Sequence, residues 1–176
     1  GYDGALKYNE ELMMELGNPD NFDSAKWDTF LNQMSITELK RIVEDGGYGS
    51  RAIESLGKNI NLEYDGPSGF NRTNLSPNVP GSNMTALPCE NLVGQTWSKE
   101  LLYLAGQILG RDAQNFGLSG IYAPGVNLHR EINNGRNYEY YSEDGVLSGF
   151  YAAYFIKGAA SNGLYCYVKH LALYDS

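Results

Sequence analysis

The feature of the sequence that most constrains its fold is an alternation of short apolar strands with helices. Strands are predicted at 60–64, 121–128 and 164–173, and helices at 98–115 and 143–160. Strands that alternate with helices of this length form parallel βαβ units, because a parallel partner strand needs a crossover connection. The alternation therefore predicts an α/β fold with a parallel sheet.

The first part of the chain is less regular. Residues 1–23 show little periodicity and are predicted to be a lead-in or linker, with one domain at 24–176. Residues 24–45 are predicted to form helix in two pieces. Ser35 and Glu38 have the spacing of a capping box, which marks the start of the second piece.

Charge and composition exclude several classes of protein. The chain has 176 residues, with 13 basic and 21 acidic side chains and a net charge of −8. An acidic chain without a basic cluster is a poor ligand for nucleic acid. The sequence contains no run of 18 apolar residues, so no membrane-spanning helix is predicted. No targeting segment is visible, so the compartment, cytoplasmic or secreted, stays open.

Neither a metal site nor a cofactor site is predicted. Cys89 and Cys166 form no CxxC pair, and we expect two free, buried thiols. His129 and His170 lie 41 positions apart and belong to no zinc motif. The segment 47–52 fits the glycine pattern of a dinucleotide site, but it follows a predicted helix instead of a strand.

Polar residues at the predicted strand ends are the candidates for function. Asp65 follows the first strand, Arg136 lies in the polar segment 129–143, and Lys169 and His170 interrupt an apolar strand. Adjacent strand residues point to opposite faces, so we expect Lys169 and His170 to diverge unless a bulge redirects one of them. Each residue also has a plain structural interpretation: a turn cap, a solvated loop, or a strand end reaching solvent.

Several segments carry a family resemblance by their order and spacing. They are Asp65-Gly66-Pro67-Ser68-Gly69-Phe70, Leu87-Pro88 with Gln95-Thr96-Trp97, Tyr122-Ala123-Pro124-Gly125-Val126-Asn127, Gly135-Arg136-Asn137-Tyr138-Glu139 with Tyr141-Ser142-Glu143-Asp144, and Val168-Lys169-His170. Together they resemble the catalytic barrel of glycoside hydrolase family 3, the β-glucosidase-like enzymes. The resemblance covers roughly residues 24–175.

The resemblance implies a fold and a site. The implied fold is the first half of a TIM-type (β/α)8 barrel, incomplete in this chain. Asp65, Arg136, Lys169 and His170 match the family positions that bind the sugar in the −1 subsite. Glu139 also matches the family motif, and we interpret it as loop scaffolding.

The sequence departs from the family pattern at two places. Leu171-Ala172-Leu173-Tyr174 stands where the family commonly has Phe-Ala, a further residue and Asn, and Glu131–Asn134 replaces a segment that often holds Pro. The family nucleophile, an Asp in a Ser-Asp-Trp-like segment, has no counterpart here, and neither has the acid/base. We therefore expect no catalytic residue in this chain.

The predicted function is the sugar-binding portion of a retaining, exo-acting β-glycosidase that hydrolyses terminal β-linked glucose or a related sugar. Its expected partners are a β-glucoside or oligosaccharide substrate, and either the remaining part of the enzyme or a second copy, because half a barrel leaves an open sheet edge. The alternatives are a noncatalytic carbohydrate-binding protein and a structural or interaction domain with a relict pocket.

Overall fold

The computed structural model describes residues 2–70 and 84–171. By its internal contacts the chain divides into two units, Gly1–Asn61 and Leu62–Ser176, which are described separately below. The proposed domain boundary at residue 24 stays a prediction. Within the described residues, no helix is long and apolar enough to cross a membrane.

The first unit is mainly helical. Its elements are α1 (Tyr2–Leu16), the 3₁₀ helix η1 (Pro19–Asn21), α2 (Lys26–Leu31), α3 (Ile36–Glu44), β1 (Gly49–Ser50) and η2 (Glu54–Leu56). The predicted lead-in thus contains a helix. Leu12 and Leu16 of α1 are buried in the core of this unit, where they cluster with Phe30.

The predicted capping box is confirmed at the start of α3. The Ser35 hydroxyl accepts from the Glu38 amide at 3.2 Å, and Glu38 Oε2 accepts from the Ser35 amide at 2.8 Å. Glu38 Oε1 also accepts from the Ser55 amide at 2.9 Å. Hydrogen bonds from Ser55 and then Ser35 lower the pKa of Glu38 to about 2. One carboxylate therefore caps α3 and ties it to η2.

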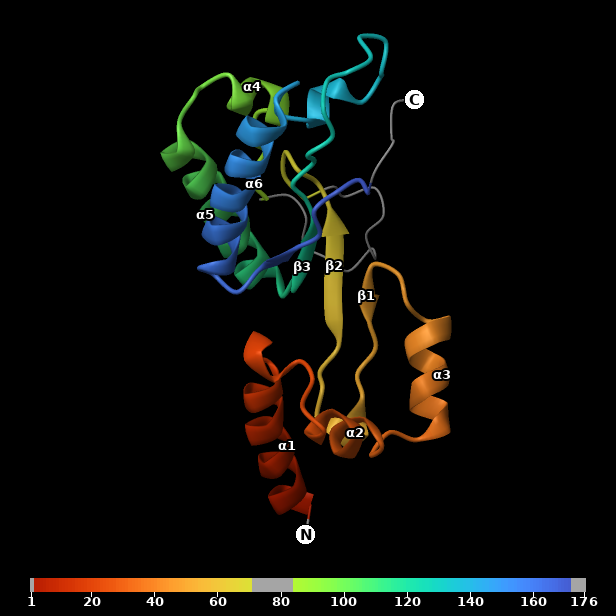
Figure 1. Cartoon of the computed structure of the whole chain (residues 1–176). Helices are drawn as coiled ribbons and strands as arrows, with labels where there is room; N and C mark the ends of the chain where they lie inside the picture. Colours follow the sequence, from red (N-terminus) through yellow and green to blue (C-terminus); the bar gives the residue numbers. More distant parts are fainter. Residues whose placement is uncertain (1, 71–83, 172–176) are drawn as a thin grey trace. The chain divides into compact units, whose positions relative to one another are not determined.

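The second unit contains the parallel sheet and its covering helices (Figure 1). Strands β2 (Asn61–Asp65), β3 (Gly120–Tyr122) and β4 (Tyr165–Cys166) pair in parallel, in that order. Between them lie α4 (Glu90–Gly94), α5 (Lys99–Phe116), η3 (Asn137–Glu139) and α6 (Gly145–Ala160). The predicted α/β fold is confirmed as a partial (β/α) barrel.

One face of this sheet carries the core and the other carries polar groups. Tyr64 and Ile121 pack with Leu109 of α5 and Phe155 of α6. Because side chains alternate along a strand, Glu63 and Asp65 share the face opposite to Tyr64. Polar groups at the end of β2 therefore point away from the helices, as they do inside a barrel.

Helices α5 and α6 lie side by side at very close range (Figure 1). A Cβ on Gly106 of α5 would overlap the Phe155 carbonyl oxygen, and one on Gly158 of α6 would overlap the Tyr103 carbonyl oxygen. Glycine at these two positions lets each backbone approach the other, which brings both helices onto a narrow sheet.

Two predicted strands are shorter in the structure. β3 ends at Tyr122, just before the cis peptide between Ala123 and Pro124. Proline has no amide hydrogen to donate, so the regular ladder stops there. β4 ends at Cys166, and of the predicted strand at 164–173 residues 172–173 lie outside the described residues. The Asn-, Ser-, Pro- and Thr-rich sequence of residues 71–86 predicts a long loop, which lies outside the described residues except for 84–86.

The helices also differ from their predictions in detail. The sequence predicts Ser142 as the cap of the helix at 143–160, but α6 is capped by Asp144, whose Oδ1 accepts from the Leu147 amide at 2.9 Å. In α5 the sequence spacing predicts that Leu101 and Leu104 face the core, yet these side chains are half exposed. Other residues of the helix, such as Leu102 and Leu109, are buried instead. α5 is apolar on more than one side, so periodicity alone does not show which side meets the core. The two cysteines are free as predicted, although only half-buried.

Candidate functional site

The structure brings the four predicted site residues together in the second unit. Lys169 Nζ lies 2.8 Å from Asp65 Oδ1. Arg136 Nη2 lies 3.0 Å from His170 Nε2. Residues separated by more than a hundred positions thus form one polar cluster at the carboxyl ends of the parallel strands, which is where barrel enzymes place their active sites.

The strand ends are held together by backbone hydrogen bonds beyond the regular ladder. Lys169 forms a parallel bridge with Gly125. Its amide donates to the Pro124 carbonyl at 3.0 Å, and its own carbonyl accepts from the Val126 amide at 2.7 Å. These bonds place Lys169 above the end of β3 and beside Asp65.

The expectation that Lys169 and His170 point to opposite faces is wrong. Both side chains enter the same polar cluster. Strict alternation holds only within a regular strand, and regular pairing ends at Cys166. Beyond it, in the described residues, the chain is held by single contacts, the Tyr167 amide on the Ile121 carbonyl at 2.9 Å and the bridge between Lys169 and Gly125.

Arg136 is positioned by the irregular loop that precedes α6. Its amide donates to Oδ1 of the buried Asn134 at 2.9 Å, which is an Asx turn built by the local sequence. The base of the loop is closed by the His129 amide, which donates to the Ser142 carbonyl at 3.2 Å. The next residues form η3, which leads directly to Glu139.

Glu139, which the sequence pattern placed in the loop scaffold, lies in the same polar cluster. Its buried carboxylate pairs with Arg136 through Oε1, and Oε2 lies 3.4 Å from Lys169 Nζ. One carboxylate therefore balances two cations that approach it from different segments. Its place in the Gly135–Glu139 motif was the available signal.

His170 is fixed in one orientation by three groups. Tyr140 Oη lies 3.0 Å from its Nδ1, Arg136 contacts its Nε2, and its backbone amide donates to Asn127 Oδ1 at 2.7 Å. Burial lowers the pKa of His170, and the Arg136 and Lys169 charges lower it further. Because a guanidinium only donates, Nε2 must accept, and the neutral ring carries its proton on Nδ1.

A second buried acid, Glu90, lies behind the site at the start of α4. Its Oε2 accepts from the Gly125 amide at 2.9 Å. Burial raises the pKa of Glu90 to about 8, against opposing hydrogen bonds from Gly125 and Tyr141. The sequence does not indicate that Glu90 is buried behind the site, because an acidic residue in the first turn of a helix is common.

The cluster suits a neutral polyhydroxyl ligand better than a metal. About a third of the Asp65 side chain is accessible, so the site combines a reachable acceptor with cationic donors and a neutral imidazole. Across residues 2–70 and 84–171, no group of three or more His, Cys, Asp or Glu side chains is arranged to hold a metal ion.

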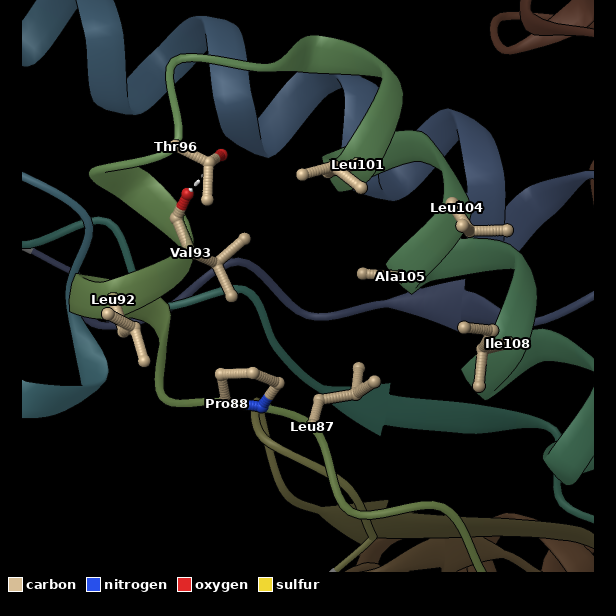
Figure 2. Close-up of a pocket in the computed structure, with 9 residues that line it drawn as sticks. All are labelled: Leu87, Pro88, Leu92, Val93, Thr96, Leu101, Leu104, Ala105 and Ile108. Carbon is tan, nitrogen blue, oxygen red and sulfur yellow. Dashed lines mark hydrogen bonds between the residues drawn. The ribbon is translucent and has the colours of Figure 1, made fainter.

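A separate apolar pocket lies between α4 and α5 (Figure 2). Its volume is about 210 Å³. The lining residues are apolar except Thr96, whose hydroxyl donates to the Val93 carbonyl at 2.7 Å: Leu87, Pro88, Leu92, Val93, Thr96, Leu101, Leu104, Ala105 and Ile108. The pocket contains none of the four predicted site residues.

The parallel strands, their covering helices and the polar cluster at the strand ends define a partial (β/α) barrel with a candidate binding site at its carboxyl edge. The glycosyl hydrolase family 3 N terminal domain matches residues 77–176, which is more than half of the chain. The chain therefore belongs to glycosyl hydrolase family 3.

Named relatives agree with this assignment. The chain is 37% identical over 127 residues to β-glucosidase A of Butyrivibrio fibrisolvens, covering 72% of this chain and 15% of that protein. It is 35% identical over 150 residues to a β-glucosidase of Rhizobium radiobacter, covering 85% of this chain and 18% of that protein. The structure of β-glucosidase 3B from Thermotoga neapolitana, in complex with α-D-glucose, matches with a TM-score of 0.71 and 31% identity, covering 82% of this chain and 23% of that one.

Proposed function

We propose that this chain is the sugar-binding portion of a retaining, exo-acting β-glycosidase of the β-glucosidase type. In this proposal Asp65, Arg136, Lys169 and His170 hold the terminal sugar, and the nucleophilic Asp and the acid/base Glu lie outside the chain. The observation that carries the proposal is the convergence of these four side chains at the ends of the parallel strands.

The chemistry of the cluster supports binding. The Asp65 carboxylate can accept from sugar hydroxyls, while Lys169 and Arg136 donate to their oxygens. A retaining glycosidase also needs two free carboxylates about 5–5.5 Å apart. Glu139 is engaged by Arg136 and Lys169, and Glu90 is buried behind the strands. We therefore expect binding but no turnover from this chain alone.

The test is glucose binding by the 176-residue chain, measured by isothermal titration calorimetry and by NMR. Asp65→Ala and Lys169→Ala should each weaken binding about tenfold or more, because each removes a charge-assisted hydrogen bond. Lys157→Ala is the matched control, since Lys157 is exposed on α6 away from the cluster. Unchanged affinity in both site variants would overturn the proposal.

Two alternative functions make different predictions. A noncatalytic carbohydrate-binding protein would bind glucose in the whole protein and never hydrolyse an aryl β-glucoside. A structural domain with a relict pocket would bind no sugar, and Asp65→Ala would change nothing measurable. Assaying the whole protein and the chain side by side separates these two alternatives from the proposal.

The proposal also includes a partner, which is the rest of a longer protein that completes the barrel. The apolar pocket supports it, because Leu92, Leu101 and Leu104 are each about half exposed around its rim. Outer helices of a barrel are flanked on both sides, and α6 flanks only one side of α5. Self-association through the same surface is the competing arrangement.

A further inference from the structure

A buried carboxylate on β2 gathers three tyrosine hydroxyls from the neighbouring strands. Glu63 Oε1 accepts from Tyr165 Oη at 2.6 Å and from Tyr167 Oη at 2.8 Å. Glu63 Oε2 accepts from Tyr122 Oη at 2.8 Å. Glu63 is only 8% exposed, whereas Tyr165 and Tyr167 are each about 40% exposed and cover it. No family motif noted in the sequence contains Glu63, and the proposed sugar site does not use it.

This Glu63–tyrosine cluster lies next to the proposed sugar site, two residues earlier along the strands. Glu63 precedes Asp65 by two positions on the same face of β2, and Tyr167 precedes Lys169 by two. Tyr122 is the register partner of Asp65 on β3. Gly120 is the register partner of Glu63, and a Cβ there would overlap the Tyr165 ring. Glycine at 120 therefore makes room for the cluster.

The cluster joins the two chain segments that carry the ion pair above it. Asp65 comes from the end of β2, and Lys169 comes from the segment after β4, with β3 between them. At the level of the site, the two segments meet across β3 in the Asp65–Lys169 contact of 2.8 Å. The cluster supplies a second link, because Glu63 on β2 accepts from Tyr165 and Tyr167 on the far side of β3.

We infer that Glu63 is a positioning residue, which sets the separation of Asp65 and Lys169 by tying β2 to the segment 165–167 through tyrosine hydroxyls. The inference rests on the proposed function in that the pair it positions is part of the proposed sugar site. Charge-assisted hydrogen bonds are shorter and stronger than neutral ones, so three of them on one carboxylate restrain the spacing of the segments that they join.

The first experiment measures the Asp65–Lys169 contact without any sugar. A zero-length carbodiimide joins a carboxylate to an amine that touches it, and peptide mass spectrometry separates the Asp65–Lys169 product from the Glu139–Lys169 product. The variant is the double substitution Tyr122→Phe with Tyr167→Phe, which keeps every charge. We expect the ratio of the two products to fall at least about threefold, since small displacements of a site are costly.

The control for the first experiment is Tyr151→Phe. Tyr151 is also buried in this unit, but its hydroxyl has no hydrogen-bond partner among the described residues. A general loss of folded protein lowers both products together and leaves their ratio unchanged. Should the double variant lose the wild-type circular dichroism spectrum, the single Tyr167→Phe variant replaces it. A wild-type ratio in a folded cluster variant would overturn the inference.

The second experiment tests the consequence for sugar binding. Glucose and its monodeoxy analogues are titrated into wild type and the double variant. We expect the variant to bind glucose about tenfold more weakly and to lose discrimination against the analogue that lacks the hydroxyl held by Asp65. Weakening of all sugars by one factor would contradict a positioning role. If wild type binds no sugar while the product ratio still falls, the proposed function fails and the role of Glu63 stands.

Discussion

At the scale of single residues, the site depends on groups whose burial changes their protonation. His170 is kept neutral because burial and its cationic neighbours lower its pKa. The pKa of Glu90 shifts in the opposite direction, because burial raises it to about 8. A neutral imidazole and a largely protonated acid therefore lie close to the Asp65–Lys169 pair at pH 7.

The raised pKa of Glu90 predicts a pH dependence of stability. Between its unfolded pKa near 4.5 and its folded pKa near 8, the folded state binds more protons, so the free energy of unfolding falls as pH rises. In wild type we expect the free energy of unfolding to fall by an amount on the order of a few kcal/mol between pH 5 and pH 8. Glu90→Gln replaces the protonated acid by a neutral amide, so this decrease should be absent from the variant. Urea unfolding of both proteins at these two pH values measures it.

The control for this prediction is the direction in which the free energy of unfolding of the Glu90→Gln variant still changes with pH. His170 contributes in the opposite direction, because its lowered pKa makes stability fall as pH drops below about 6.5. The Gln variant should therefore gain stability, or stay level, from pH 5 to pH 8. An unchanged downward slope in the variant would show that Glu90 titrates normally.

A buried hydroxyl on α6 offers a second test at the residue scale. Ser148 is 1% exposed, and its Oγ has no hydrogen-bond partner among the described residues. Ser148→Ala removes an unsatisfied group and improves helix propensity, so unfolding should cost about 1 kcal/mol more. Thermal unfolding with Ser161→Ala as control checks it. Ser161 donates to the Gly158 carbonyl at 2.6 Å, so its variant should gain nothing.

At the scale of elements, the contact between α5 and α6 decides how the helices cover the sheet. Gly158→Ala on α6 would force its new methyl group into the Tyr103 carbonyl, and we expect a loss of about 1–3 kcal/mol or more in the free energy of unfolding. Gly149→Ala on the same helix has nothing within 4 Å of its new Cβ. That control should gain about 0.5–1 kcal/mol. Denaturant unfolding of both variants makes the comparison, and similar losses in the two would refute the packing argument.

At the scale of the whole molecule, the described residues expose apolar side chains along α4 and α5, among them Leu92, Leu101 and Leu104. Without the rest of a barrel we expect the 176-residue chain to self-associate, because burying this surface is favourable. Sedimentation velocity should then give a mass above 19.5 kDa. Leu104→Glu, in the apolar pocket, should shift the chain toward monomer.

The matched control for association is Val146→Glu. Val146 is 84% exposed and lies outside the α4–α5 pocket, so it adds the same charge to a different surface. Equal effects of the two substitutions would show that net charge, and not the pocket, governs association. A monodisperse wild-type monomer with full thermal stability would contradict the expected need for a partner.

The sequence by itself determined the order of the three parallel strands and the two long helices in the second unit, the capping box of α3, and the family to which the chain belongs. These follow from local signals: hydrophobic period, cap spacing, and short motifs read in order. The same motifs were enough to select Asp65, Arg136, Lys169 and His170.

Only the tertiary structure decided how those residues meet. In the folded chain Lys169 and His170 lie in the same cluster, and Glu139 pairs with two cations. Glu90 is buried, and three tyrosine hydroxyls donate to Glu63. It also chose which apolar side of α5 is covered. The physical reason is that burial, pairing and pKa depend on neighbours brought from distant positions by parallel strand pairing, and one-dimensional periodicity does not encode those neighbours.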